Sequence, residues 1–309
     1  MSTEPTTVTA ADGTALRLWE RTPASAEEAV LHVHGSITSS RALFDPPVDR
    51  GGDPDSGDRV DDSYSWLAAT ARAGRAAFAL DIRGYGDSDR PPEMDAPPEA
   101  NDPPVRAPTA ARDVAAAVDQ LSSRFDRIHL VGVSWGTMVC GRYVADGEAP
   151  VDSLVQCAPV YLPPWSFAEV AAALNVDPDL DAYYEQRYDA VSDRQGGDDA
   201  LFEAIWRTQV ESNQGVDDET YLAQSGALAD SKAAAEGERV YDATTLDVPT
   251  LVVRGSDDGI SVREDALGLY DELDCEREYA EVGGADHYAM HGPRRTALYD
   301  LTNGFYERA

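Results

Sequence analysis

Apolar residues gather into short runs along the chain, and these runs predict the strands of a buried sheet. They are almost continuously apolar, which is typical of strands covered on both faces. The runs lie at 29–34, 76–82, 127–133, 153–158 and 250–254. A further strand is predicted at 277–282. Near the start, two strands at 6–10 and 14–19 flank the pair Asp12-Gly13, which is a β-hairpin signal.

Between these strands, helical periodicity takes over from the continuous apolar pattern. The predicted helices lie at 64–73, 110–121, 138–145, 262–273 and 294–306. Strands that alternate with helices predict a mostly parallel sheet with helices on both faces, which is the α/β fold class.

Three stretches interrupt this alternation. Residues 45–62 are acidic and rich in Pro, Gly and Ser, and 85–108 are rich in proline, so both are predicted to be irregular. Residues 161–245 are acidic, rich in alanine and dotted with aromatic residues, with helical rather than strand periodicity. We therefore expect a helical cap insertion at 161–245, set into a core formed by residues 1–160 and 246–309.

The predicted strand at 127–133 runs directly into Gly132-Val133-Ser134-Trp135-Gly136, a G-x-S-x-G pattern followed by a helix. A nucleophile on a tight turn between strand and helix needs neighbours without side chains, so that its hydroxyl stands clear of the sheet. The same turn places Ser134 at a helix N-terminus, whose partial positive charge favours a developing oxyanion. A serine in a glycine-rich turn is more often a simple turn residue, but here the strand, turn and helix occur together.

With these motifs the sequence resembles the α/β-hydrolase superfamily. His32-Val33-His34-Gly35-Ser36 is similar to the His-Gly segment that follows a core strand in this family. The resemblance implies that the backbone N–H groups of Ser36 and Trp135 form an oxyanion hole. The segment 81–88, Asp-Ile-Arg-Gly-Tyr-Gly-Asp-Ser, is similar to a D-x-R-G-x-G-x-S motif with a structural role in the family.

The resemblance also implies a histidine base and an orienting carboxylate in the order Ser134, Asp258, His287. His287 follows the last predicted strand in a glycine-rich loop, and His291 is the alternative four residues later. The segment Gly255-Ser256-Asp257-Asp258 resembles the family's G-x-x-D pattern, which favours Asp258 and leaves Asp257 as the alternative. His32 and His129 lie inside predicted strands and are expected to be core residues, whereas His34 is expected to shape its loop.

These residues predict a serine hydrolase that forms an acyl-enzyme without a metal or another cofactor. The expected substrate is a small or medium apolar carboxylic ester. Thioesterase, lactonase, C–C hydrolase and aminopeptidase activities are alternatives on the same fold, as is a non-catalytic ligand-binding relative. A serine nucleophile argues against dehalogenase and epoxide hydrolase chemistry, which in this family uses an aspartate. Trp165, Tyr183, Tyr184 and Trp206 could line the acyl site or form the core of the insertion.

The charge of the chain bears on its surface and leaves the predicted chemistry unchanged. The chain of 309 residues has 57 acidic and 25 basic residues, a net charge of −32, with Lys232 as its single lysine. Because the acids are spread among patterned apolar segments, we interpret the excess as an adaptation to high salt, which screens their repulsion. Nucleic acids and anionic membranes would be repelled. No apolar run is long enough to span a bilayer and no secretion signal is evident, so we expect a cytoplasmic protein.

Overall fold

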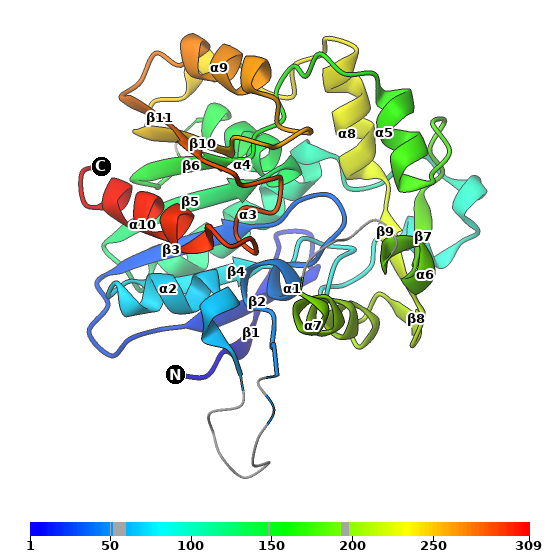
Figure 1. Ribbon diagram of the computed structural model, residues 1–309, viewed down its shortest axis with the longest axis horizontal. Coiled ribbons are helices and arrows are strands. Elements are labelled where there is room, and N and C mark those ends of the chain that lie inside the picture. Colours follow the sequence, from blue (N-terminus) through cyan, green and yellow to red (C-terminus); the bar gives the residue numbers. More distant parts are fainter. Residues whose placement is uncertain (50, 52–59, 148, 193–197) are drawn as a thin grey trace.

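The computed structural model describes residues 1–49, 51, 60–147, 149–192 and 198–309. Within these residues, the centre of the molecule is an eight-stranded sheet with the order β1-β2-β4-β3-β5-β6-β10-β11 (Figure 1). The strands are β1 (Glu4–Thr9), β2 (Ala15–Arg21), β3 (Glu28–Val33), β4 (Ala76–Leu80), β5 (Arg127–Val133), β6 (Ser153–Cys157), β10 (Thr250–Gly255) and β11 (Arg277–Val282). β1 and β2 form the predicted hairpin, β2 also pairs with β4 in antiparallel fashion, and the remaining pairs are parallel. The predicted mostly parallel sheet is therefore confirmed.

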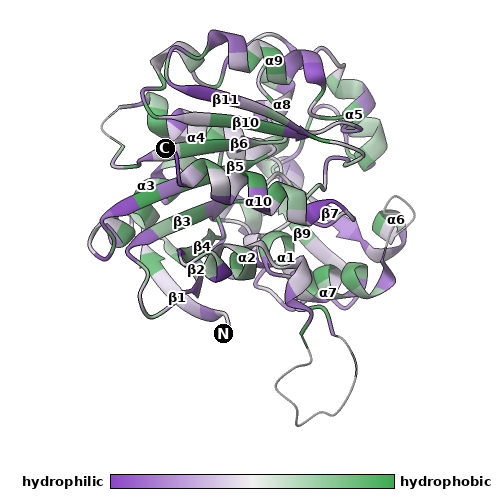
Figure 2. Ribbon diagram, turned by 60° about the vertical axis from the view of Figure 1, so that its left-hand side comes forward, coloured by the Kyte–Doolittle hydropathy of each residue, from purple (hydrophilic) through white to green (hydrophobic). Residues whose placement is uncertain are grey.

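Helices cover both faces of this sheet, as the alternation in sequence predicts. α1 (Ser40–Phe44), α2 (Trp66–Arg72) and α10 (Arg295–Tyr306) pack on one face, and α3 (Ala107–Ser122), α4 (Trp135–Ala145) and α9 (Arg263–Glu272) pack on the other. Successive strand residues point to opposite faces. Leu130 of β5 therefore packs on the side of α3, α4 and α9, and Val131 packs on the side of α1, α2 and α10. In Figure 2, α9 carries hydrophilic and hydrophobic residues side by side, as a helix with one buried face should.

The segment at 161–245 leaves the sheet after β6 and returns to it before β10. It contains α5 (Phe167–Leu174), β7 (Tyr183–Arg187), α6 (Tyr188–Ser192), α7 (Asp199–Val210), β8 (Gly215–Asp217), β9 (Thr220–Gln224) and α8 (Gly226–Ala235). The segment contains helices as expected, and in addition β7, β9 and β8 form a second, antiparallel sheet that its helical periodicity did not predict. β7 is short and most of its residues are exposed or half-buried, so it has no apolar run that would mark it as a strand.

Of the two other irregular stretches, the structure describes all of 85–108 and only part of 45–62. Residues 85–108 contain the short 3-10 helices η2 (Pro92–Asp95) and η3 (Pro98–Ala100). Of the predicted acidic loop at 45–62, residues 50 and 52–59 lie outside the described residues. At its edges, Asp49 and Val60 form an isolated antiparallel bridge, and the buried Asp45 pairs with Arg21 at 3.0 Å.

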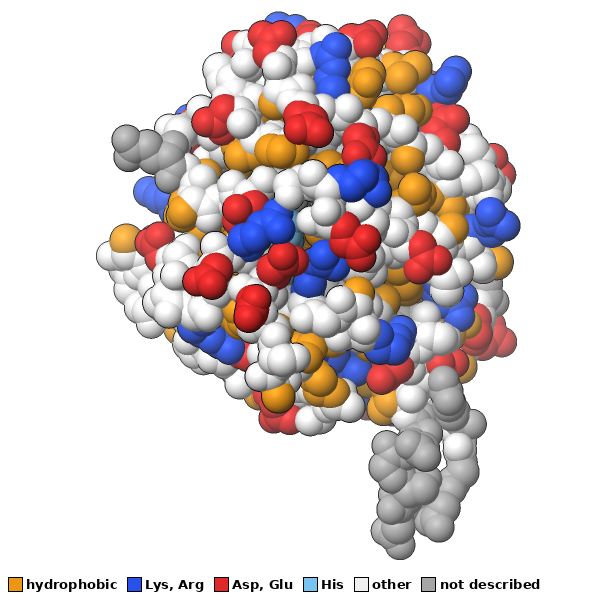
Figure 3. Space-filling view, turned by 90° about the vertical axis from the view of Figure 1, so that its left-hand side faces the viewer, with side chains coloured by type: hydrophobic (Ala, Val, Ile, Leu, Met, Phe, Trp, Pro, Cys, Tyr) orange, Lys and Arg blue, Asp and Glu red, His pale blue; other side chains and the backbone are white. Residues whose placement is uncertain are grey.

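Acidic side chains are dispersed over the surface in place of forming a single block. Figure 3 shows them across one whole face, interspersed with arginines. Several are paired, for example Glu278 with Arg308 at 2.8 Å and Glu20 with Arg124 at 2.5 Å. No helix in the described part of the chain is long and apolar enough to cross a membrane.

Candidate active site

Ser134 occupies the sharp turn between β5 and α4, in a backbone conformation that few residues adopt. Its φ of 56° and ψ of −120° lie in a sparsely populated region, which costs about 1–3 kcal/mol and is tolerated only where the surroundings enforce it. A Cβ on Gly132 would lie 2.3 Å from the carbonyl oxygen of Gly136, and a Cβ on Gly136 would lie 2.4 Å from that of Val33. The two glycines of the G-x-S-x-G pattern are therefore required by close backbone packing around the serine.

A hydrogen-bonded chain joins Ser134 to His287 and His287 to Asp258. The Oγ of Ser134 lies 3.0 Å from Nε2 of His287, and Nδ1 of the same ring lies 2.9 Å and 3.1 Å from the two carboxylate oxygens of Asp258. Nδ1 of His287 therefore carries a proton that it donates to Asp258, which leaves Nε2 as the acceptor for the serine hydroxyl.

The three residues meet because their strands are parallel and end at the same edge of the sheet. Ser134 follows β5, Asp258 follows β10, and His287 follows β11. The buried carboxylate of Asp258 is held by the backbone N–H groups of Ile260 and Ser261, each at 2.8 Å. These donors fix the carboxylate in the orientation that reaches His287.

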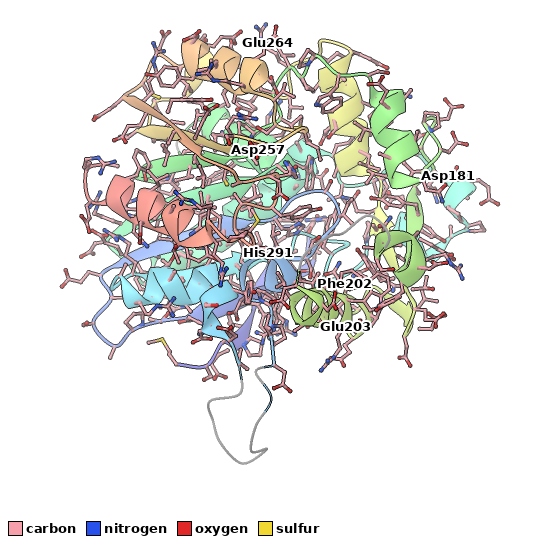
Figure 4. All side chains as sticks on the ribbon, in the orientation of Figure 1. Asp181, Phe202, Glu203, Asp257, Glu264 and His291 are labelled. Atoms are coloured by element: carbon pink, nitrogen blue, oxygen red, sulfur yellow. The ribbon has the colours of Figure 1, made fainter. Side chains whose placement is uncertain are left out.

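The alternative residues, Asp257 and His291, lie outside the hydrogen-bonded chain of Ser134, His287 and Asp258 (Figure 4). The side chain of Asp257 is exposed and accepts a hydrogen bond from the hydroxyl of Ser256 at 2.8 Å. His291 lies beside α1, where its Nε2 donates to the carbonyl oxygen of Leu43 at 2.8 Å, and burial lowers its pKa to about 4. Asp258 and His287 are thus the members of each pair that join the chain to Ser134.

Of the remaining histidines, two belong to the core and one to a loop beside Ser134. His32 is fully buried and contacts the carbonyl oxygen of Phe78 at 2.9 Å, and the buried His129 contacts the hydroxyl of Ser153 at 2.8 Å. His34 is also fully buried: its Nε2 accepts from the N–H of Ile82 at 3.2 Å, so its Nδ1 donates to Gly35. Burial lowers the pKa of each of these three histidines to about 4.

The predicted oxyanion amides belong to the two backbone segments that flank Ser134. The N–H of Trp135 is the first of helix α4 and has no partner within the helix. The segment Gly35–Ser36 passes directly over the serine, since a Cβ on Gly35 would lie 3.2 Å from the Cβ of Ser134. His34 holds the carbonyl oxygen of Gly35 at 2.8 Å, and in a trans peptide this also fixes the direction of the N–H of Ser36.

An apolar cavity of about 170 Å³ opens onto Ser134 and His287. Apolar residues that line it come from the 161–245 segment (Trp165, Val170, Leu174 and Leu228), from the loop after β10 (Ile260) and from the chain just after β6 (Val160). None of the described residues that line it carries a permanent charge. A second cavity of about 200 Å³ adjoins it across Ile37 and Ala173.

The aromatic residues of the 161–245 segment divide between these cavities and the packing of the segment itself. Trp165 lines the first cavity and Trp206 lines the second. The hydroxyl of Tyr183 donates to the carbonyl oxygen of Ala96 at 2.9 Å, and Tyr184 packs against a small apolar cluster around Phe167. Of these four aromatic residues, Trp165 is the one that lines the cavity next to Ser134.

Sequence reasoning missed several polar residues that support the site. Tyr85, within the D-x-R-G-x-G-x-S motif, donates its hydroxyl proton to the carbonyl oxygen of Ser36 at 2.7 Å. Two glutamines of the 161–245 segment also contribute. Gln209 forms hydrogen bonds with the backbone of Ile37 and Ser39 in the same loop, and Gln224 donates to the hydroxyl of Tyr85. The motif could have drawn attention to Tyr85, but isolated glutamines outside any motif give no sequence signal.

Comparison with protein families agrees with this geometry. The family model described as alpha/beta hydrolase fold matches residues 52–292 of the chain, which is well over half of its length. The chain belongs to the α/β-hydrolase fold family. The resemblance inferred from the motifs is thereby confirmed, and the family supports a hydrolase that acts on small molecules. No relative was found among curated protein sequences.

Solved structures give the same fold at low sequence identity. An esterase from Exiguobacterium antarcticum superposes with a TM-score of 0.67 at 17% identity, covering 98% of this chain and 100% of its own. A serine hydrolase involved in carbazole degradation gives 0.63 at 17% identity, with 100% of both chains covered. A thioesterase domain from the curacin biosynthetic pathway gives 0.61 at 15% identity, covering 97% of this chain and 99% of the domain. Because these identities are low, the likeness establishes the fold and leaves the substrate open.

Proposed function

We propose that this chain is a serine carboxylesterase that cleaves small or medium uncharged esters through an acyl-enzyme intermediate. The observation that carries the proposal is the hydrogen-bonded chain Ser134–His287–Asp258 opening onto an apolar cavity. A serine hydroxyl is a weak nucleophile by itself, and this arrangement supplies the adjacent base and the group that orients it.

In the proposed reaction, Nε2 of His287 takes the proton of Ser134 as Oγ attacks the ester carbonyl carbon. Asp258 accepts from Nδ1 and stabilises the imidazolium that forms. His287 then gives the proton to the leaving alcohol, and the C–O bond of the ester breaks. In the second half, His287 removes a proton from water as the water oxygen attacks the acyl carbon. His287 then gives this proton to Oγ of Ser134 as the acyl C–O bond breaks, which releases the carboxylic acid and restores free Ser134.

The N–H groups of Ser36 and Trp135 are the proposed donors to the tetrahedral oxyanion. Trp135 offers its amide at the positive end of the α4 dipole, which favours negative charge. Each such donor contributes roughly 10²–10³-fold to kcat in comparable hydrolases. Backbone donors suit this role because they are fixed before the reaction and need no reorganisation.

The cavity supports an uncharged acyl group of modest size. Its volume of about 170 Å³ is smaller than sites that enclose drug-sized ligands, which are roughly 300–1,000 Å³. A carboxylate on the acyl chain would lose its hydration in this cavity without an ionic partner, which is strongly unfavourable. In dilute buffer the acidic surface would repel anionic substrates as well, and molar salt would screen this repulsion.

A panel of p-nitrophenyl esters in molar KCl tests the proposal. We expect kcat/KM for butanoate and hexanoate to exceed that for palmitate by at least about tenfold, because the cavity is short. The hemisuccinate ester, of butanoate-like length but charged, should be cleaved at least about tenfold more slowly than butanoate. Ser134→Ala should abolish turnover, and His287→Ala should lower kcat by about 10³-fold or more.

Two outcomes would contradict the proposal. Turnover in Ser134→Ala equal to that of the unmodified chain would show that another group does the chemistry. A folded chain that cleaves none of the esters, yet binds their acids, would indicate a ligand-binding relative.

A further inference from the structure

The backbone that carries the N–H of Ser36 is fixed at four consecutive peptide groups. His34 holds the carbonyl oxygen of Gly35, and Tyr85 holds that of Ser36. The next two peptide groups, on either side of Thr38, are both held by the side chain of Gln209. We call residues 35–39 the oxyanion segment.

Gln209 makes three hydrogen bonds to the oxyanion segment. Its Nε2 donates to the carbonyl oxygen of Ile37 at 3.3 Å, and its Oε1 accepts from the backbone N–H of Ser39 at 3.1 Å. The hydroxyl of Ser39 donates to the same Oε1. A neutral carboxamide suits this position because it supplies a donor and two acceptor lone pairs at once.

Gln209 is not part of the sheet core but of α7, about 170 residues further along the chain. It is 4% exposed, so water cannot replace its hydrogen bonds. Next to it, Leu201, Ala204 and Ile205 of α7 pack with Ala42 of α1, the helix that begins directly after the oxyanion segment. α7 is thus docked on this segment by an apolar contact and a polar one.

We propose that Gln209 is a positioning residue for the oxyanion hole, so that the 161–245 segment completes the catalytic apparatus as well as covering the cavity. The inference rests on the proposed function, because it concerns the same reaction. Without Gln209, the two peptide groups beside Thr38 are free to rotate, and the N–H of Ser36 is held only by the hydrogen bonds from His34 and Tyr85 to its own two peptide groups, so its position is less well fixed. Misplacement of a catalytic group by about 1 Å can cost roughly 10²-fold in rate.

Gln209→Met tests the proposal, because methionine has a similar length and removes all three hydrogen bonds. Gln214→Met is the matched control. Gln214 is also a buried glutamine of the 161–245 segment, and it binds the carbonyl oxygens of Gly86 and Ser88 and the side chain of Arg90. Among the described residues it makes no hydrogen bond to the oxyanion segment, so its loss should lower stability without moving that segment.

With p-nitrophenyl acetate, which is too short to reach the second cavity, we expect Gln209→Met to lower kcat by about tenfold or more and to change KM less than about threefold. Gln214→Met should lower kcat by less than about twofold, even where its loss of stability is as large. Gln209→Glu retains the oxygen that accepts from Ser39 and loses the donor to Ile37, so its kcat should fall between those of the unmodified chain and Gln209→Met.

A transition-state mimic gives a readout that a purely structural role would not move. A trifluoromethyl ketone with a short alkyl chain adds to a serine hydroxyl and places an oxyanion where the tetrahedral intermediate has one. Its dissociation constant should rise in Gln209→Met by about the same factor as kcat falls. The affinity for butanoate, which forms no tetrahedral adduct, should stay within about threefold.

Equal kcat values for Gln209→Met and the unmodified chain, or equal losses in both methionine variants at matched stability, would overturn the positioning role. These outcomes differ from failure of the proposed function. In that case the unmodified chain would neither cleave the acetate ester nor bind the trifluoromethyl ketone.

Discussion

The indole N–H of Trp135 donates a hydrogen bond of 2.9 Å to the carboxylate of Asp230, joining the turn at Ser134 to helix α8. Asp230 is almost completely buried, and the same carboxylate accepts from the backbone N–H of Ala107 at 2.6 Å and pairs with Arg106. One side chain therefore connects the starts of α3 and α4 to the 161–245 segment.

Removal of this carboxylate should destabilise the chain. Asp230→Ala leaves two buried N–H donors without partners, so we expect the free energy of unfolding to fall by about 2–4 kcal/mol. Asp146→Ala is the control, because Asp146 pairs with Arg142 on the surface and should contribute less than about 1 kcal/mol. Urea unfolding in molar KCl measures both. Similar values for the two variants would show that the buried hydrogen bonds contribute little.

Glycine substitutions should have opposite effects at two positions. Gly268 lies on the exposed face of α9, where an added Cβ meets nothing within 4 Å, so Gly268→Ala should raise the free energy of unfolding by about 0.5–1 kcal/mol. Gly136→Ala would bring its Cβ against the carbonyl oxygens of Val33 and His34 and should prevent a stable fold or lower stability by several kcal/mol. Thermal unfolding followed by circular dichroism separates the two effects. A stable Gly136→Ala variant would contradict the close packing around Ser134.

The buried histidines should make the protein sensitive to mild acid. Burial lowers the pKa of His32 from 6.5 to about 4, so the unfolded chain binds a proton there more readily than the folded chain. The stability that neutral His32 contributes is complete above pH 6.5 and is lost as the pH falls toward 4. Each such histidine contributes a slope of about 1 kcal/mol per pH unit in this window. His34, His129 and His291 behave in the same way.

His32→Gln tests this directly, because it removes one of these groups. The slope of unfolding free energy against pH between 5 and 6.5 should become shallower by about 1 kcal/mol per pH unit. Burial also raises the pKa of Asp81 and Asp265, which gives slopes of the opposite sign, but these are common to both proteins and cancel in the difference. An unchanged slope in a folded His32→Gln variant would show that His32 takes up a proton in the folded state.

Salt should stabilise the chain. A net charge of −32 produces strong repulsion in dilute buffer, where the Debye length is about 10 Å at 0.1 M, and little at 1 M, where it is about 3 Å. We expect the free energy of unfolding to rise steadily between 0.1 and about 2 M KCl. Far-UV circular dichroism across the titration, with NaCl as a second salt, measures it. A chain that is equally stable in dilute buffer would contradict the adaptation to salt.

The inner strands of the main sheet, β3, β4, β5, β6 and β10, were predictable from sequence because both of their faces are buried. β5 and β11 have the predicted bounds, and α4 begins at Trp135, three residues before the predicted start. The earlier start reflects the strained turn at Ser134, where close backbone packing outweighs the low helix propensity of Gly136. β7 and β8 escaped prediction because they are short and have no buried apolar run, so they leave no strand pattern in the sequence.

The residues of the candidate site also differ in how far the sequence predicts them. The resemblance to the family favoured Ser134, Asp258 and His287, and these three residues lie together because they follow parallel strands that end at one edge of the sheet. Sequence could not separate Asp257 from Asp258, since the choice depends on which carboxylate faces the N–H groups of Ile260 and Ser261. The contribution of Gln209 follows from the packing of α7 on α1, and no local pattern encodes that contact.

The central claim is that Ser134 is the nucleophile, and intact-mass analysis after treatment with a fluorophosphonate tests it most directly. The reagent loses fluoride and forms a phosphonate ester only with an activated serine. We predict one adduct per chain on the unmodified protein, mapped by peptide sequencing to Ser134, and none on a folded Ser134→Ala variant. An adduct that persists in Ser134→Ala, or a folded unmodified chain that takes up no reagent, would contradict the account.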